Sequence, residues 1–293
     1  MSGHFADRLV AAVRRTGGPV CVGLDPVVER MPAELSGLAV GEAFARFGVG
    51  VVEAVRGVAA AVKPQLACYE RYGVAGLGAY EATVGAAREA GLLVVADAKR
   101  GDIGVSARHY AAALLGDGGL GGGADAVTVS PYLGPDTVEP FVEAAAERDS
   151  GAGVFVLVRT SNPGSGDLQG LRLEDGRAVC EAVADSVAAM GAAHVGAAGY
   201  SLVGAVVGAT HPGDAAALRG RMARQVFLVP GYGAQGGGVA DVLPCFNDDG
   251  LGALITASRS VIYAHELRGG VDWREAVAVA AAAMRDELAA GLR

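Results

Sequence analysis

Alternating charges follow an apolar run near the middle of the chain. Residues 92–96, Leu-Leu-Val-Val-Ala, have the length and composition of a buried strand, and Asp97 and Lys99 come directly after them. Side chains of a strand alternate between its two faces, so a strand that continues through Lys99 places Asp97 and Lys99 on the same face. Together they would supply the anion and the proton-carrying cation that acid–base and electrostatic catalysis require. A structural ion pair at a strand end has the same pattern.

Asp102 lies just beyond this pair, where Gly101 permits a turn and a helix can begin. A carboxylate at that place can cap the helix, because it accepts a hydrogen bond from a free backbone N–H. Alternatively, Asp102 adds a further charge to the same site. Motifs elsewhere in the sequence are needed to distinguish these two roles.

The composition indicates a protein with a large core. The chain has 293 residues, of which 52% are hydrophobic. This length is close to the roughly 250 residues of one barrel domain, so we expect residues 1–293 to form a single domain. The formal net charge of -8 provides no basic surface for a nucleic acid.

We expect a cytoplasmic protein. The four cysteines, Cys21, Cys68, Cys180 and Cys245, are widely spaced and form no CxxC pair, which argues against structural zinc and a disulfide scaffold and favours reduced thiols. Residues 1–15 mix charged and apolar side chains, which is not the pattern of a signal peptide. The apolar run at 277–284 is too short to span a membrane.

Apolar runs alternate with helical patterns along the chain. We expect strands at residues 19–25, 58–62, 92–96, 126–130, 153–158, 202–209, 226–229 and 253–257. We expect helices at residues 41–58, within 69–90, and at 135–147, 175–190 and 273–288. Eight such units predict an α/β fold whose parallel sheet closes as a (β/α)8 TIM barrel, although a doubly wound open sheet uses the same order of elements.

Polar residues gather at one end of these expected strands. The following all lie at or just after a carboxyl end: Asp25, Lys63, Asp97, Lys99, Ser130, Arg159, Thr160, Ser161, Thr210 and Arg259. In a barrel the carboxyl ends of the strands converge on one mouth, where active sites are built. Any one of these residues is also what a solvated loop contains, but the whole set predicts a site at the mouth.

Two segments after the last strands suit a phosphate group. Residues 230–238, Pro-Gly-Tyr-Gly-Ala-Gln-Gly-Gly-Gly, follow the seventh strand, and Ser258, Arg259 and Ser260 follow the eighth. These are the usual phosphate-binding positions of such barrels. Glycines let backbone N–H groups approach an anion, and arginine adds a fork of donors. A flexible loop beside a surface arginine is the alternative.

Together these motifs resemble the orotidine 5'-phosphate decarboxylase family, in particular its longer bacterial branch. The most specific motif is Asp97-x-Lys99-x-x-Asp102-Ile103. The supporting motifs, in order, are Gly-Leu-Asp-Pro at 23–26, Lys-Pro-Gln at 63–65, Ser-Pro-Tyr-Leu-Gly at 130–134, Thr-Ser-Asn-Pro-Gly at 160–164, Val-Gly-Ala-Thr at 207–210, Pro-Gly-Tyr-Gly-Ala-Gln at 230–235 and Ser-Arg-Ser at 258–260. The resemblance implies a (β/α)8 barrel and a homodimer with shared active sites. It also implies conversion of orotidine 5'-phosphate to UMP and carbon dioxide, the last step of de novo UMP synthesis, without metal or cofactor.

The resemblance further implies a role for each matching residue. Lys63, Asp97, Lys99 and Asp102 match the family's alternating catalytic array, with Asp102 supplied by the second subunit. The substrate-binding matches are Asp25 for a ribose hydroxyl, Ser161 beside the pyrimidine, Gln235 and Arg259 for the phosphate, and Ile103 and Ser106 from the second subunit. Ser106 stands where threonine is commoner, and Ser258 replaces the glycine of shorter members.

The implied reaction explains the need for these charges. Loss of carbon dioxide from C6 of the pyrimidine leaves an electron pair in the ring plane, where the π-system cannot delocalise it, so electrostatic stabilisation has to dominate. An ammonium at Lys99 would stabilise this carbanion and then protonate it. Asp97 would either repel the departing carboxylate or orient Lys99, and both roles stay open. Lys63 and Asp102 complete an alternation in which buried charges pair.

Two alternatives use the same barrel. A related phosphosugar decarboxylase or aldolase would need a divalent metal to stabilise an enediolate. A non-catalytic nucleotide-binding barrel would use the phosphate site alone and release no carbon dioxide. Lys63, Ile103 and Ser161 in their present contexts favour the nucleotide enzyme.

Overall fold

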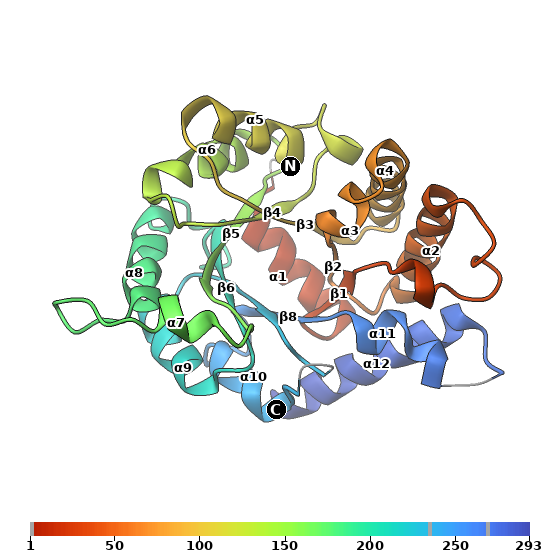
Figure 1. Cartoon of the computed structure of the whole chain (residues 1–293). Coiled ribbons are helices and arrows are strands. Elements are labelled where there is room, and N and C mark those ends of the chain that lie inside the picture. Colours follow the sequence, from red (N-terminus) through yellow and green to blue (C-terminus); the bar gives the residue numbers. More distant parts are fainter. Residues whose placement is uncertain (1–2, 234–235, 268–269) are drawn as a thin grey trace.

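Eight parallel strands pair in chain order and close into a barrel in the computed structural model, which describes residues 3–233, 236–267 and 270–293 (Figure 1). The strands are β1 (Val20–Leu24), β2 (Ala61–Pro64), β3 (Leu93–Arg100), β4 (Ala126–Val129), β5 (Gly153–Arg159), β6 (Val203–Val207), β7 (Phe227–Pro230) and β8 (Ala253–Ala257). Because β1 pairs with both β2 and β8, the barrel has no open edge. The predicted (β/α)8 TIM barrel is confirmed.

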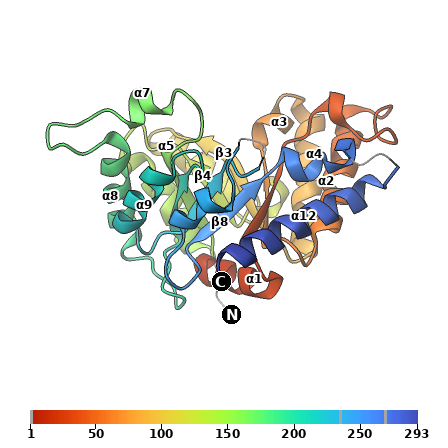
Figure 2. The same ribbon diagram turned by 90° about the horizontal axis from the view of Figure 1, so that it is seen from below.

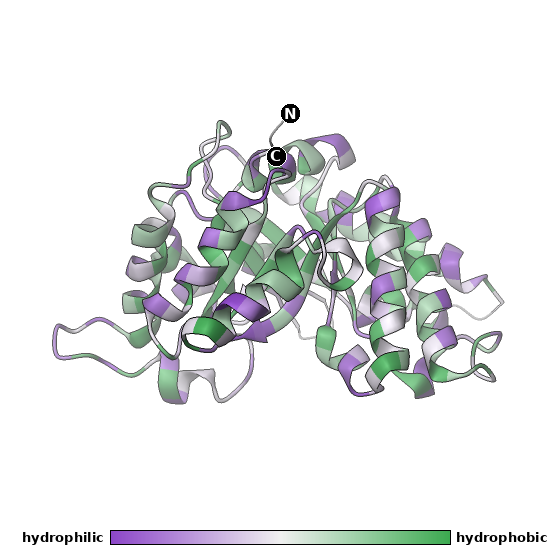
Figure 3. Cartoon of the chain, turned by 90° about the horizontal axis from the view of Figure 1, so that it is seen from above, coloured by the Kyte–Doolittle hydropathy of each residue, from purple (hydrophilic) through white to green (hydrophobic). Residues whose placement is uncertain are grey.

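Helices surround the barrel (Figure 1). They are α1 (Phe5–Thr16), α2 (Val40–Val55), α3 (Leu66–Glu70), α4 (Gly73–Glu89), α5 (Gly104–Leu115), α6 (Glu139–Glu147), α7 (Ser165–Gln169), α8 (Val179–Gly191), α9 (Pro212–Arg221), α10 (Val239–Val242), α11 (Arg259–Ile262) and α12 (Trp273–Gly291). Five 3-10 turns lie between them: η1 (Val28–Arg30), η2 (Leu120–Gly122), η3 (Pro135–Thr137), η4 (Leu243–Cys245) and η5 (Ala264–Leu267). Apolar residues concentrate in the strands and polar residues on the helices outside them (Figure 3). Within the described ranges, no helix combines the length and apolarity needed to cross a bilayer.

All eight expected strands are present, but several of their ends differ from the prediction. The strand expected at 58–62 begins only at Ala61, because α2 is followed by a tight turn in which Gly57 has a φ of 76°. The strand expected at 202–209 is shorter, and the one expected at 92–96 extends to Arg100. The strand expected at 253–257 has the predicted ends.

The helix predicted at 175–190 was wrong at its start. It begins at Val179, and residues 171–178 instead form a projecting loop closed by a bridge between Arg172 and Ala178 (Figure 1). The helix predicted at 135–147 begins with a 3-10 turn, because Pro135 and Pro140 remove backbone donors from the first turns.

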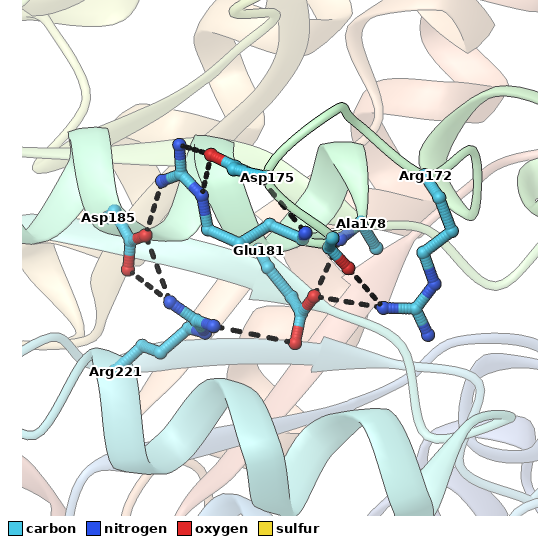
Figure 4. Close-up of polar contacts among 8 residues, drawn as sticks. Arg172, Asp175, Ala178, Glu181, Asp185 and Arg221 are labelled. Carbon is cyan, nitrogen blue, oxygen red and sulfur yellow. Dashed lines mark hydrogen bonds and ion pairs between the residues drawn. The ribbon is translucent and has the colours of Figure 1, made fainter.

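Ion pairs connect the projecting loop to the helices behind it (Figure 4). Arg177 pairs with Asp175 in the loop and with Asp185 on α8, while Arg221 on α9 also pairs with Asp185. These side chains are largely exposed to solvent, which weakens each ion pair. Several pairs sharing partners nevertheless hold the loop in one position against α8.

α1 covers one end of the barrel, and α3 and α7, which follow β2 and β5, lie at the other (Figure 2). Phe5 of α1 packs edge-on against Phe155 of β5, with ring centroids 5.9 Å apart. Gly153 at the start of β5 leaves room for Phe5, since a Cβ there would lie 2.3 Å from the Phe5 ring. The amino-terminal end of the barrel is therefore filled, and the carboxyl ends of the strands are left for a site.

Candidate active site

A cavity of about 540 Å³ lies at the carboxyl ends of the strands. It is lined by Asp25, Lys63, Gln65, Asp97, Lys99, Thr128, Leu157, Thr160, Ser161, Asn162, Gln169, Val206, Leu228 and Pro230. The lining therefore comes from β1 to β7 and the loops after them. Its size suits a small ligand of nucleotide dimensions.

Three charges of the predicted array meet at the cavity wall. Asp97 Oδ2 lies 2.5 Å from Lys63 Nζ, and Asp97 Oδ1 lies 2.5 Å from Lys99 Nζ. The Lys63 and Asp97 side chains are 8% and 6% exposed, whereas that of Lys99 is 45% exposed. Lys99 is thus the charge of this trio that an incoming ligand can reach most directly.

Burial and neighbouring charges have opposing effects on the pKa values of Asp97 and Lys63. Burial by itself would raise the pKa of Asp97, but the positive charges of Lys63 and Lys99 outweigh it and hold that pKa well below its usual range. Burial would likewise lower the pKa of Lys63, but Asp97 and Asp25 outweigh it and raise that pKa. Both groups are therefore ionised at neutral pH.

The backbone conformation at Lys99 differs from the regular strand that was predicted. Lys99 has a φ of 48°, and it is the one non-glycine residue in the described parts of the chain with a positive φ. The register between β3 and β4 also shifts between Ala96 and Arg100. Regular strand alternation through Lys99 was therefore the wrong expectation. The side chains of Asp97 and Lys99 meet all the same, at 2.5 Å.

One carboxylate oxygen of Asp25 has no hydrogen-bond partner in the described part of the chain. Its Oδ1 is buried and accepts no hydrogen bond from the described residues. The backbone around it is held firmly, since the Tyr263 hydroxyl donates to Asp25 O at 3.1 Å and accepts from Val27 N–H at 2.8 Å. A buried acceptor in a cavity wall needs a donor, which a ligand hydroxyl can provide.

The predicted phosphate segments are neighbours at the mouth. A Cβ on Gly233, which has a φ of 74°, would lie 3.0 Å from Ser260 Oγ, so the loop after β7 runs against the start of α11. Arg259 is the first residue of α11, is exposed, and has no carboxylate within 4 Å among the described side chains. Gln235, the other residue predicted to hold the phosphate, lies outside the described residues.

The residues predicted to act across a dimer do not line this cavity. Asp102 is half-buried and its Oδ1 accepts from Ile103 N–H at 2.8 Å. It is not the N-cap of α5, because Ile103 occupies that position. Ser106 is exposed on α5, and Ile103 is 64% exposed.

Further exposed apolar residues lie in the same segment as Ile103 and in the segment beside it. Val105 lies on α5, and Tyr132 and Leu133 lie in the loop after β4. The two segments are adjacent, since a Cβ on Gly101 would lie 3.1 Å from Ser130 O. An apolar patch of this kind is unusual on a free surface.

Four polar residues of the cavity were not assigned a role from the sequence. Gln65 Nε2 donates to Asp97 Oδ2 at 3.0 Å, and Thr128 Oγ1 donates to Asp97 Oδ1 at 3.0 Å. Gln169 accepts from Thr160 N–H at 2.9 Å, and Asn162 Oδ1 accepts from the Thr160 hydroxyl. Gln65 and Asn162 belong to motifs quoted in the sequence analysis, whereas no motif there contains Thr128 or Gln169.

Arg159 turns away from the cavity although it ends β5. Its guanidinium bonds to Asp214 Oδ2 at 2.8 Å and to Ser165 Oγ at 2.9 Å, and the side chain is buried. It therefore fixes the start of α7 to α9. A position at a strand end does not by itself bring a side chain into the site.

Comparisons with known proteins agree with this geometry. Residues 18–270 match the model of the orotidine 5'-phosphate decarboxylase / HUMPS family. The chain is 44% identical to orotidine 5'-phosphate decarboxylase of Deinococcus radiodurans, with 98% of each chain covered, and 42% identical to that of Rhodopirellula baltica, with 97% and 98% covered. It is similar to the structure of Leishmania donovani OMP decarboxylase, with a TM-score of 0.78, 34% identity and 99% of each chain covered. The chain therefore belongs to the orotidine 5'-phosphate decarboxylase / HUMPS family.

Proposed function

We propose that this protein decarboxylates orotidine 5'-phosphate to UMP and carbon dioxide, the reaction for which its relatives are named. The observation that carries the proposal is the Lys63–Asp97–Lys99 array in the wall of the cavity at the barrel mouth. An ammonium fixed at 2.5 Å from a carboxylate, yet partly open to the cavity, is placed to act on a bound pyrimidine. A non-catalytic nucleotide-binding barrel has no evident use for it.

In the proposed reaction Lys99 faces C6 of the pyrimidine. Its positive charge stabilises the electron pair left on C6 when the C6–carboxyl bond breaks and carbon dioxide departs. A proton then passes from Lys99 Nζ to C6, which gives UMP and leaves Lys99 neutral until it takes up a proton from water. Asp97 holds Lys99 at the reacting carbon and lies beside the departing carboxylate.

The remaining polar residues bind parts of the substrate that do not react. Asp25, with its unpartnered Oδ1, accepts from a ribose hydroxyl, and Ser161 lies beside the pyrimidine. Arg259 and the glycine-rich loop at 230–238, including Gln235, hold the phosphate. Binding energy from the phosphate can contribute to the chemical step as well as to affinity.

We further propose a homodimer whose second subunit completes the site. Asp102, Ile103 and Ser106 do not line the cavity of their own chain, and exposed apolar side chains lie in the segment of Ile103 and in the adjacent loop after β4. Pairing two copies through this patch would cover it and bring Asp102 to the neighbouring array. The eight units of the barrel support a single domain, and four free cysteines, Cys21, Cys68, Cys180 and Cys245, support a cytoplasmic location.

An ultraviolet assay with orotidine 5'-phosphate tests the function. We expect absorbance to change as the substrate becomes UMP, with equimolar release of carbon dioxide, and the same rate in the presence of a chelator. No turnover of orotidine 5'-phosphate, together with turnover of a phosphosugar that stops on chelation and returns on adding a divalent metal, would support the metal-dependent phosphosugar alternative. Binding of UMP without any turnover would support the non-catalytic alternative.

A further inference from the structure

Lys99 adopts a backbone conformation that needs support. A φ of 48° is uncommon for a residue with a Cβ, and strain of this kind persists only where the surroundings hold it. The Lys99 backbone N–H donates to Thr128 Oγ1 at 3.0 Å. A side chain of the neighbouring strand thus holds the peptide at the point where β3 leaves regular geometry.

The same hydroxyl also contacts Asp97. Because a backbone N–H can only donate, Thr128 Oγ1 accepts from Lys99, and its own proton is then directed to Asp97 Oδ1 at 3.0 Å. Asp97 Oδ1 in turn receives Lys99 Nζ at 2.5 Å. The bonds form a closed ring that begins at the backbone of Lys99, passes through Thr128 and Asp97, and ends at the ammonium of Lys99.

Water cannot easily replace this hydroxyl. Thr128 is 1% exposed and lies in β4, paired in register with Phe155 of β5. Removing the hydroxyl would leave the Lys99 N–H without its partner and would take one of two hydrogen-bond donors on the protein side from Asp97 Oδ1. The backbone N–H of Lys99 would then lose its hydrogen-bond acceptor, and the carboxylate that holds the Lys99 ammonium would be less firmly fixed.

We propose that Thr128 is a positioning residue that aims the Lys99 ammonium at the reacting carbon, and this inference rests on the proposed decarboxylation. Thr128 acts through Asp97 and Lys99 and takes no proton itself. Its contribution should therefore appear in kcat, because a misplacement of about 1 Å can cost about 100-fold in rate. Binding of the ribose and phosphate, which uses other residues, should stay as it is.

The test compares Thr128→Val, which keeps the shape and removes the hydroxyl, with Thr128→Ser, which keeps the hydroxyl. Thr128→Val should lower kcat by about 10- to 100-fold with KM and the Kd for UMP within about threefold of wild type, and Thr128→Ser should restore kcat to within about threefold. Thr83→Val provides a matched control, because Thr83 is a fully buried threonine on α4 whose hydroxyl donates to Ala79 O. The control should keep the wild-type kcat.

Hydrogen–deuterium exchange of the peptide that contains the Lys99 amide gives a readout that does not depend on activity. Thr128→Val should exchange faster there, and Thr128→Ser should not. If wild type shows no turnover, the proposed function fails and the exchange measurement alone decides the positioning role. A Thr128→Val kcat within threefold of wild type, a Thr128→Ser kcat as low as that of Thr128→Val, or unchanged exchange would overturn the proposal. If Thr128→Val does not fold, Thr128→Ala carries the same expectations.

Discussion

At the scale of single residues, the site depends on the charge of Asp97. Each of its oxygens accepts two hydrogen bonds, Oδ1 from Lys99 and Thr128 and Oδ2 from Lys63 and Gln65. Removing a buried carboxylate from between two ammonium groups leaves Lys63 facing only Asp25 as a compensating charge. Breaking a buried pair in this way costs about 3–5 kcal/mol.

Asp97→Asn should therefore lower the free energy of unfolding at pH 7 by about 3 kcal/mol. The pKa of Asp97 is held below its ordinary value, so its contribution is present above the unfolded-state pKa of about 4 and is lost as the pH falls below that. The pKa of Lys63 is raised, so its contribution is present below about pH 10 and is lost as the pH rises further.

Denaturant unfolding of wild type and Asp97→Asn at a series of pH values checks this prediction. The difference in unfolding free energy should be level between about pH 5 and pH 10 and should shrink below about pH 4. A difference that grows as the solution becomes more acidic contradicts the charge states assigned to the pair.

Substitution of Arg259 distinguishes phosphate binding from the chemical step. Arg259 is the first residue of α11, and the next residue, Ser260, lies close to the loop after β7, so we propose that the Arg259 guanidinium holds the phosphate and not the reacting carbon. Arg259→Ala should lower kcat/KM for orotidine 5'-phosphate by about two orders of magnitude, equivalent to about 2.7 kcal/mol. Orotidine without the phosphate is the control, and its slow turnover should barely change. Equal losses for both substrates would remove Arg259 from the phosphate site.

At the scale of elements, the sequence predicted the strands better than their ends. Buried parallel strands give almost continuous apolar runs such as residues 93–96 and Val203–Val207, so all eight could be recognised. The ends depend on turns and on pairing with neighbours. The projecting loop at 171–178 was predicted in part as helix, because neither the bridge that closes it nor its ion pair to α8 produces a periodic pattern in the sequence.

The arrangement of the site was predictable only in part. Strand-end positions predicted that Lys63, Asp97 and Lys99 would meet, and the structure brings them together. The positive φ of Lys99 and the role of Thr128 come from contacts between β3 and β4, which no local pattern encodes. Conversely, Arg159 ends a strand and turns away, because Asp214 on α9 offers it a partner.

The loop after β7 yields a prediction at this scale. Gly233 combines a φ of 74° with close approach to Ser260, so an added Cβ is both strained and crowded. Gly233→Ala should lower stability by about 1 kcal/mol and raise KM for orotidine 5'-phosphate several-fold by moving the loop off the phosphate. Steady-state kinetics and thermal unfolding measure the two effects.

Gly78→Ala is the control for this substitution. Gly78 is an exposed glycine within α4 and has nothing within 4 Å of an added Cβ. Alanine there should stabilise the protein by about 0.5–1 kcal/mol and leave KM unchanged. An unchanged KM in Gly233→Ala as well would argue that the loop does not contact the phosphate.

At the scale of the whole molecule, the proposed active site requires two copies of the chain. Asp102→Ala and Lys99→Ala proteins should each be nearly inactive, because each site of the proposed homodimer takes Asp102 from one chain and Lys99 from the other. In a mixed dimer one site receives both defects and the other receives neither. Mixing the two inactive proteins should therefore restore activity, up to about one intact site per heterodimer.

Native mass spectrometry of the mixture shows whether heterodimers have formed, and the ultraviolet assay measures the recovered rate. A mixture of wild type with Lys99→Ala, at the same total concentration, controls for the effect of subunit exchange itself. Heterodimers that show no recovery would place Asp102 in the site of its own chain.

The most direct test of the central claim is the turnover of orotidine 5'-phosphate by wild type and Lys99→Ala. The account predicts carbon dioxide release by wild type and no measurable release by Lys99→Ala, with the circular dichroism spectrum preserved. Lys99 is proposed as both the charge that stabilises the C6 carbanion and the donor of its proton, so nothing else in the cavity should replace it. A Lys99→Ala rate within tenfold of wild type would contradict the mechanism.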